Sequence, residues 1–578
     1  METFGKGGLR LIETSATVIR MEPTRFVLRV GVSSALLLGG LSLALLMARG
    51  APAGGAATTT ATTTTTTTAA TTTSTLQTSI APAVLAISGH GWGHGLGLSQ
   101  WGAYGYAKHG WAYDRILAHY YTGTTLGPAK VATVRVLLAV EKKASLNSAV
   151  GWNVTDGAGT KVQLTPGVLA LKAKLAIAGH PELQPPFTFV GKQPLVVDGK
   201  PYRGKVVVSS DGKQLQVIDT VGLEGYLKGV VPAEMPSAWL PQALEAQAVA
   251  ARSYALANLT KGGGFDLYGD TRSQVYGGVD AEATTTSAAV DATKGQVVLA
   301  NGKVADTLFF STSGGRTASA ADTTGLAVPY LVSVADPYDS ISPVHSWGPV
   351  LFDAAEVTKQ LKLAAPIAGL QVANGSDGRV QTITVVSSDD SQATLTGSQF
   401  RGDLELRSTW FTPVLLQLLP VAATMTYGGA VSLRGSANGA DAVSLEAKTA
   451  ALDWSPAGEL ILGADGSFSA IVTPQLTTQY RLVWGSVRAG LARISVAPRV
   501  AAAVTAAGAQ GTIKPAVAGA AVQLQQQSGA GWLTVTSTAT DPAGGWSFTA
   551  PLQPGTYRIR CAPRHGLVPG VSAAALVQ

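Results

Sequence analysis

The chain has 578 residues, which is too many for one hydrophobic core and predicts roughly three or four domains. Its formal net charge of +7 suits either an anionic wall polymer or a solvated basic surface, and without a basic run or a nucleic-acid motif it argues against a nucleic-acid partner. Low charge and high Thr, Ala and Gly content are typical of exported β-rich proteins. The single cysteine, Cys561, excludes an intramolecular disulfide and every cysteine-cluster metal site.

Residues 1–53 predict a signal peptide or a membrane anchor. Three arginines precede an uncharged apolar run, residues 30–48, that is just long enough to span a bilayer. An Ala-x-Ala pattern favours cleavage after Ala53, whereas the length of the run and Arg49 favour a retained anchor. In both cases the basic residues before the run place the later domains outside the membrane. We therefore expect an extracellular or cell-surface protein that meets the membrane only through this segment.

Residues 54–80 predict an extended linker. Between Thr58 and Thr75, 14 of 18 residues are threonine, and none of the 18 is large and apolar. Such a segment buries too little apolar surface to offset the entropy of ordering it.

Residues 81–126 are rich in glycine and aromatic residues, and residues 89–103 read GHGWGHGLGLSQWGA. His90 and His94 suggest a metal site, with His109 and His119 as further ligands. The glycines between the first two oppose a helix that would align them, and no Asp, Glu or Cys in the motif completes a ligand set. We therefore expect neither a metal nor a cofactor, and we assign His94 to a structural or substrate-contacting role.

From residue 131 to about 413, short alternating strands such as residues 131–140, 205–209 and 214–219 surround one Ala-rich helix. Pro241 suits the first turn of this helix, and the glycines at 262–264 are expected to end it. Its apolar stripe has spacings of three and four and predicts a core helix; the members are Leu244, Ala248, Ala251, Ala255 and Leu259.

After Pro413 the pattern becomes purely β, and two segments repeat each other. Both contain an alternating strand, a tryptophan, a Gly/Ser-Phe or Trp-Ser-Phe turn and a Tyr-Arg strand, in the same order. In the first these are residues 442–445, Trp454, 466–468 and 480–482; in the second they are residues 521–524, Trp532, 546–548 and 557–559. The repeat predicts two sandwich-like modules of roughly 80 residues, 414–499 and 500–578.

Residues 224–258, EGYLKGVVPAEMPSAWLPQALEAQAVAARSYALAN, resemble the signature of the SpoIID/LytB family, which includes the stage II sporulation protein D lytic transglycosylases of bacterial cell walls. Residues 273–278, 310–317 and 400–411 resemble further segments of that family, so that 81–413 is predicted to be one SpoIID-like catalytic domain. The Gly-rich motif, which follows the Glu-bearing part in stage II sporulation protein D, precedes it here, as a circular permutation would place it. The fold class is therefore predicted to be α+β: a β-rich SpoIID-like domain with a core Ala-rich helix, followed by two all-β sandwich-like modules.

Glu234 is the carboxylate that the resemblance identifies as catalytic. Judged from its residues alone, the position fits an ordinary solvated turn at a helix end better than a catalytic site. Its apolar neighbours, among them Val231, Met235 and Trp239, would raise the pKa of a carboxyl group, as a general acid at neutral pH requires. Glu224 and Glu245 are the rival carboxylates, and both are expected to be structural, paired with Lys228 or Arg252.

Seven further residues are candidates for substrate binding through the same resemblance. For Arg252, an ion pair on the helix surface is an equal alternative to substrate binding. For the Gly-rich loop at residues 310–317, a tight turn that needs glycine is an equal alternative. Tyr276 could stack on a pyranose face. The candidates are His94, Arg252, Gln274, Tyr276, Ser311, Ser313 and Gly314.

The resemblance implies an exported lytic transglycosylase that cleaves the glycan strands of peptidoglycan with Glu234 as its single catalytic carboxylate. The family prefers strands without stem peptides, which makes an amidase an expected partner. Some members carry Cys and His zinc ligands at the place where this chain has residues 266–272, DLYGDTR, so no metal is expected here. Two alternatives remain: a non-catalytic LytB-like modulator of a wall amidase, and a wall-binding adhesin.

Overall fold

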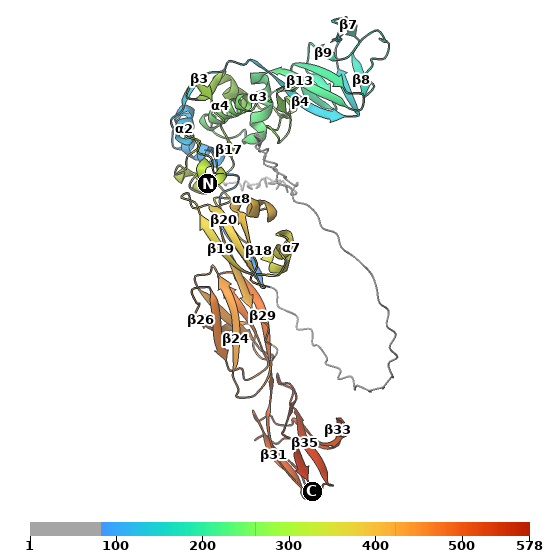
Figure 1. The fold of residues 1–578 in the computed structure, drawn as a ribbon, viewed down its shortest axis with the longest axis vertical. Helices are drawn as coiled ribbons and strands as arrows, with labels where there is room; N and C mark the ends of the chain where they lie inside the picture. Colours follow the sequence, from blue (N-terminus) through green and yellow to red (C-terminus); the bar gives the residue numbers. More distant parts are fainter. Residues whose placement is uncertain (1–82, 261, 422) are drawn as a thin grey trace, which may run out of the picture.

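The computed structural model describes residues 83–260, 262–421 and 423–578, so the predicted export segment and linker lie outside the described residues. The protein is 17% helical and 44% strand, which confirms the predicted β-rich α+β class. Figure 1 shows an elongated chain in which a β-arm, a helical layer, a central sheet and two β modules follow one another. Within the described residues, no helix has both the length and the apolar character needed to cross a membrane.

The β-arm consists of a seven-stranded sheet, β14-β4-β13-β12-β9-β6-β7, and a four-stranded sheet, β11-β10-β5-β8. Alternating valines form its core, because successive side chains of a strand point to opposite faces. The predicted strands at 131–140, 205–209 and 214–219 correspond to β4, β12 and β13. The bounds are β4 Thr133–Glu141, β5 Lys143–Ser148, β6 Trp152–Thr155, β7 Lys161–Leu164, β8 Gly167–Lys172, β9 Phe187–Gly191, β10 Leu195–Val197, β11 Lys200–Tyr202, β12 Lys205–Ser210, β13 Leu215–Gly222 and β14 Leu267–Tyr268.

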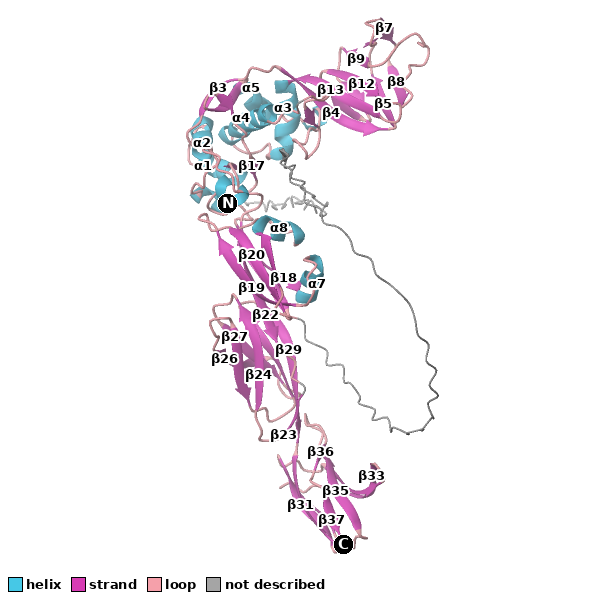
Figure 2. Cartoon of the chain, in the orientation of Figure 1, coloured by secondary structure: helices cyan, strands magenta, loops and turns pink. Residues whose placement is uncertain are grey.

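The helical layer carries most of the helices, as Figure 2 shows. Two hydrophobic clusters meet on its central helix α4: one contains the β-arm and part of α3, and the other contains α1 and α2. The bounds are α1 Gln100–Lys108, α2 Tyr113–Tyr120, α3 Leu223–Glu234, α4 Pro241–Ala257, α5 Thr284–Ala292, α6 Ala320–Thr324, η1 Val279–Ala281 and η2 Pro337–Ile341, with short strands β2 Leu98–Ser99, β3 Thr125–Pro128, β15 Gln296–Ala300, β16 Lys303–Val304 and β17 Phe309–Phe310.

The predicted Ala-rich helix is α4. It begins at Pro241, as predicted, and the first four residues of the predicted stripe are buried. The helix ends at Ala257 rather than near Gly262, because Asn258 leaves the helical conformation, so Leu259 lies beyond the helix. Small side chains on nearly all sides allow α4 to pack closely against several neighbours at once.

The central sheet has the order β18-β1-β22-β24-β27, and strand β1 lies between β18 and β22. One face packs on the three-stranded sheet β19-β20-β21 with α7 and α8, and the other packs on the first β module. The two ends of the 81–413 segment therefore lie side by side, as a circular permutation requires. The bounds are β1 Val84–His90, β18 Ser346–Asp353, α7 Ala354–Gln360, β19 Ile367–Asn374, β20 Val380–Ser387, β21 Gln392–Thr396, α8 Gly397–Asp403 and β22 Phe411–Leu418.

Strand β22 runs across the predicted domain boundary between residues 413 and 414. Leu415 on one face of β22 belongs to the cluster with β19–β21, whereas Val414 and Leu416 on the other face belong to the core of the first module. One strand therefore supplies side chains to two cores.

The first module has the sheet β23-β29-β28-β25-β26, which packs on the central sheet, and the second has β30-β31-β34 and β33-β32-β35-β36, with β37 paired to β35. The repeat in the sequence has a structural counterpart: Arg481 lies 4.0 Å from the Trp454 ring centroid and Arg558 lies 4.2 Å from that of Trp532. Cys561 is buried on β35. The bounds are β23 Ala423–Thr426, β24 Val431–Asn438, β25 Val443–Lys448, β26 Ser455–Leu460, β27 Ser467–Val472, β28 Thr478–Trp484, β29 Val487–Ala497, β30 Arg499–Thr505, β31 Gly508–Lys514, β32 Ala521–Ser528, β33 Gly531–Ala539, β34 Gly545–Phe548, β35 Gly555–Ala562, β36 Gly570–Val571 and β37 Ala575–Val577.

Candidate functional site

Glu234 is the last residue of α3. The next residue, Met235, has the extended conformation φ −136°, ψ 136°, which ends the helix, and Pro232 lies inside the last turn. The Glu234 carboxylate is half-buried and has no hydrogen-bond or ion-pair partner among the described residues. Burial raises its pKa from 4.5 to about 7. The partial negative charge of the helix C-terminus acts in the same direction.

Two tyrosines respond to the charge of Glu234. Burial raises the pKa of Tyr226 and of Tyr254, and the Glu234 carboxylate adds to both shifts. Tyr226 is buried on α3, and its hydroxyl donates a hydrogen bond to Oε1 of Gln274 at 3.3 Å. Tyr254 is half-buried on α4, with its ring centroid 6.0 Å from that of Phe309. The seam between the two clusters that meet on α4 passes the end of α3, because Val231 belongs to the first cluster and Met235 to the second, so Glu234 lies between residues of both.

A second half-buried carboxylate, Asp306, lies on the same side of α4. Its Oδ1 accepts a hydrogen bond from Nδ2 of Asn258 at 2.8 Å. Burial raises the pKa of Asp306, and its charge contributes to the raised pKa of Tyr254. Tyr254 therefore senses both carboxylates. Asp306 was not predicted from the sequence, because nothing in its local pattern distinguishes it from a solvated loop residue.

Gln247 also faces this seam and was not predicted. It precedes Tyr254 by seven residues, or about two helical turns, so the two side chains share a face of α4. Gln247 is fully buried, and neither its amide oxygen nor its amide nitrogen has a partner among the described residues. The signal that could have found it is a glutamine in an otherwise small, apolar stretch of a core helix.

The two rival carboxylates are engaged in protein contacts. Glu224 forms an ion pair with Arg252, with 2.6 Å between Oε2 and the guanidinium, and accepts a further bond from the Gly295 N–H at 3.0 Å. Glu245 accepts a hydrogen bond from Nε2 of Gln242 at 2.9 Å. The expected pairing of Glu224 with Arg252 is present, whereas Lys228 pairs with Asp291 instead.

Arg252 lies in the interior and not on the helix surface. Its side chain is fully buried, and besides Glu224 it donates to the carbonyl oxygens of Gln296 and Val290. A guanidinium enclosed in this way cannot reach a substrate. Both alternatives suggested by the sequence, a substrate contact and a surface ion pair, therefore give way to a buried ion pair that joins α3 to α4.

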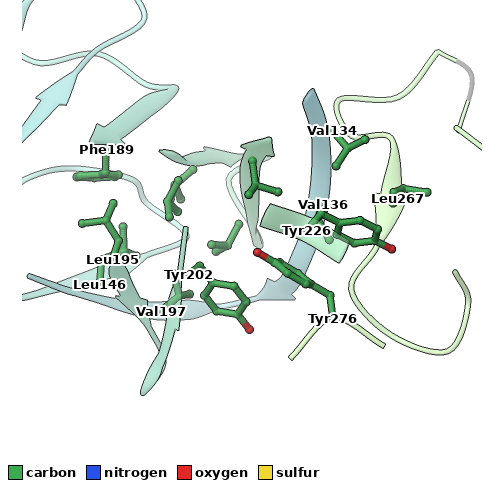
Figure 3. Close-up of a cluster of buried hydrophobic side chains, with 14 of the residues drawn as sticks. Val134, Val136, Leu146, Phe189, Leu195, Val197, Tyr202, Tyr226, Leu267 and Tyr276 are labelled. Atoms are coloured by element: carbon green, nitrogen blue, oxygen red, sulfur yellow. The ribbon is translucent and has the colours of Figure 1, made fainter. Parts of the chain in front are cut away.

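Gln274 and Tyr276 are core residues too. Tyr276 is 5% exposed, and its hydroxyl donates to Oδ2 of Asp219 at 2.9 Å. Figure 3 shows its ring beside Tyr226 within the cluster that joins the β-arm to α3. Gln274 is 2% exposed and is held by the Tyr226 hydroxyl. The proposed stacking of Tyr276 on a sugar ring is therefore not possible in this conformation.

The Gly-rich loop follows the turn interpretation. The backbone N–H groups of Ser313 and Gly314 donate to the buried carboxylate of Asp339 at 3.0 and 2.9 Å. Gly314 has φ +78°, and a Cβ there would lie 2.6 Å from that of His90, so only glycine fits. Ser313 and Gly314 are buried, whereas Ser311 is half-buried and is the predicted binding residue of this loop that a ligand could touch.

The histidines of the Gly-rich motif have protein partners. Nδ1 of His94 accepts from the Leu96 N–H at 3.1 Å, and its Nε2 lies 3.1 Å from the Phe309 carbonyl oxygen. Burial lowers the pKa of His94 to about 4, so this ring is neutral at pH 7 and holds the loop in place. Within residues 83–260, 262–421 and 423–578, no three His, Cys, Asp or Glu side chains are grouped as metal ligands would be.

Comparison with known proteins places the Glu-bearing segment in one family. The family model described as SpoIID, stage II sporulation protein, matches residues 211–299. Three relatives are an uncharacterised protein of Brachyspira hyodysenteriae (38% identical over 24% of this chain), the amidase enhancer of Bacillus subtilis (31% over 37%) and the stage II sporulation protein D of the same organism (31% over 34%).

The alignments cover 38%, 29% and 61% of these relatives, so this chain spans less than two thirds of each. A solved chimeric tandem of titin Z1 and Z2 domains covers 28% of the chain at 14% identity and a TM-score of 0.14, which is too low for any inference. The matched segment 211–299 contains Glu234 and α4 together with the core residues Gln274 and Tyr276. Residues 211–299 are therefore the part of this chain that is similar to the SpoIID/LytB family.

Proposed function

We propose that the SpoIID-like domain is a lytic transglycosylase that cleaves the glycan strands of peptidoglycan, with Glu234 as its single acid and base. The family and its relatives give the chain a cell-wall-related role. The observation that supports a catalytic role within it is the unpartnered, half-buried carboxyl of Glu234, whose pKa is raised to about 7. A general acid works best when its pKa lies close to the operating pH.

The reaction requires two proton transfers, in which Glu234 is first the donor and then the acceptor. Protonated Glu234 donates its proton to the oxygen of the β-1,4 bond. The bond from that oxygen to C1 of a muramic acid breaks at the same time, and C1 gains oxocarbenium character. The resulting Glu234 carboxylate then accepts the proton of the 6-hydroxyl of the same muramic acid, and O6 bonds to C1. The products are a free 4-hydroxyl and a 1,6-anhydro ring. No water enters, so a second catalytic carboxylate is not needed.

The test is product analysis with peptidoglycan from which the stem peptides have been removed. We expect the full chain to release fragments with 1,6-anhydromuramic ends, detected by mass spectrometry. Glu234→Gln should reduce the rate by roughly 10²–10⁴-fold or more, because the amide keeps the shape but has no transferable proton. Glu245→Gln is the matched control and should cleave at the rate of the unaltered chain. Reducing ends in place of anhydro ends would show hydrolysis and refute this mechanism.

One comparison favours a second candidate, a modulator of a wall amidase. The Bacillus subtilis relative that is 31% identical over 215 residues is named amidase enhancer. In this alternative the chain releases no anhydro fragments but increases the rate at which a wall amidase removes stem peptides. Adding the chain to an amidase on intact peptidoglycan, with Glu234→Gln in parallel, separates the two functions. Stimulation that survives the substitution, without anhydro products, would establish the modulator.

A further inference from the structure

Three half-buried aromatic rings gather beside the connection that follows Glu234. Trp101 and Tyr104 lie three residues apart on α1 and therefore share a face of that helix. Trp239 comes from the connection between α3 and α4. Its ring is stacked on Tyr104, with centroids 4.6 Å apart and planes 12° apart, and meets the edge of Trp101 at 4.8 Å. We call these three residues the aromatic platform.

The platform is only partly accounted for by packing. Tyr104 and Trp239 rest against the cluster of α1, α2 and α4, whereas Trp101 lies outside that cluster. The indole N–H groups of Trp101 and Trp239 and the Tyr104 hydroxyl have no protein partner among the described residues. Two buried tryptophans behave differently, because Trp152 and Trp347 each donate to a backbone carbonyl oxygen at 2.9 Å. Lys108 Nζ lies 5.5 Å from the centroid of the Tyr104 ring, which is also stacked on Trp239, so the platform combines partly covered aromatic rings with polar groups that have no protein partner.

The platform lies close to Glu234 along the chain. Trp239 follows Glu234 by five residues, which limits their separation to about 17 Å even for an extended chain. A turn in which the backbone N–H of Trp239 donates to the Pro236 carbonyl oxygen at 3.0 Å shortens that path. On its other side, the backbone N–H of Trp101 donates to the carbonyl oxygen of Ser311 at 3.0 Å, so the platform also adjoins the half-buried end of the Gly-rich loop.

We propose that Trp101, Tyr104 and Trp239 bind an N-acetylhexosamine ring of the glycan strand, next to the bond that Glu234 cleaves. A pyranose ring offers a face of C–H groups that stacks on the electron-rich face of an aromatic ring, and its hydroxyl and acetamido groups can bond the free indole N–H groups. The inference rests on the proposed function. It gives these rings the stacking role that the buried Tyr276 cannot perform.

The test measures binding separately from cleavage. The full chain carrying Glu234→Gln is titrated with the β-1,4-linked tetramer of N-acetylglucosamine by isothermal calorimetry. Adding Trp101→Ala should weaken binding by about tenfold, the effect of losing one well-formed aromatic contact. Trp101→Phe should recover part of the loss. Trp454→Ala, which removes a half-buried tryptophan of the first β module, is the matched control and should leave the affinity unchanged.

Folding is monitored in every variant by thermal unfolding. Trp101→Ala should unfold at the temperature of its parent, since its ring lies outside the cluster. Equal affinity with and without the Trp101 ring, or no binding by the Glu234→Gln parent, overturns the platform. If Trp101→Ala weakens binding as expected but the unaltered chain releases no anhydro products, only the proposed reaction is overturned. A Trp101→Ala chain that loses amidase stimulation but keeps tetramer binding would assign the platform to a protein partner.

Discussion

Replacing Glu234 by glutamine should stabilise the folded domain at neutral and alkaline pH while it removes activity. The pKa of Glu234 is about 7 in the folded chain, against an ordinary value of 4.5. Below pH 4.5 the group is protonated in both the folded and the unfolded state and does not lower the free energy of unfolding. As the pH rises toward 7 the unfolded chain loses this proton first, so stability falls, and above pH 7 the whole penalty is present.

The shift of about 2.5 pKa units corresponds to at most about 3.4 kcal/mol. Because part of the side chain is exposed and solvent screens it, we expect about 1–3 kcal/mol. Because the SpoIID-like domain is larger than most single domains, each 1 kcal/mol should shift its Tm by only roughly 1–2 °C. Glu234→Gln should therefore raise the Tm of the SpoIID-like domain by roughly 1–5 °C at pH 8 and leave it unchanged at pH 4.

Differential scanning calorimetry is the suitable assay, because a chain with several cores does not unfold in one step. The transitions of the β modules then act as internal references, since they should be identical in both proteins. Activity of the unaltered chain should fall as the pH rises through about 7, when the general acid loses its proton. A Tm difference that is absent, or that is the same at pH 4 and pH 8, would refute the raised pKa and with it the argument for Glu234 as an acid.

Two further predictions concern stability. Arg252→Ala should destabilise the domain by up to about 3–5 kcal/mol, because it removes a fully buried guanidinium and leaves the half-buried Glu224 without its partner. Soluble yield and thermal unfolding measure this effect, and adding Glu224→Gln should recover part of the loss. A stable single variant would contradict the buried ion pair. A chain that starts at residue 130 should aggregate or be inactive, because it lacks strand β1, which lies between β18 and β22, and the helices α1 and α2 of the second cluster. If that chain unfolds cooperatively and cleaves glycan, residues 83–126 are dispensable.

Features that depend on local pattern were predictable. The start of α4 at Pro241, its buried alanines and the two β modules follow from periodicity, from proline placement and from a repeat. The raised pKa of Glu234 was expected from its apolar neighbours in the sequence, and burial is the cause in the structure.

Features that depend on distant partners were not predictable. Tyr276 is held by Asp219, and Ser313 by Asp339, so the residues that resemble a sugar-binding set serve to build the core. Arg252 was likewise not predictable as a core residue, because its partner Glu224 lies on another helix. The boundary at 413 was set by a change of composition, but β22 continues through it because it pairs with β1, more than 300 residues earlier, and with β24 as far as Leu418.

Helix α3 shows how one element gives two glutamates opposite roles. Glu224 lies in its first turn, where the partial positive charge of the helix favours an anion, and Arg252 and the Gly295 N–H bind its oxygens. Glu234 lies at the opposite end, where the helix disfavours an anion, and no donor among the described residues compensates it. The first carboxylate is therefore held by two donors and joins α3 to α4. The second gains and loses a proton easily near neutral pH, which is the property that an acid and base acting in turn requires.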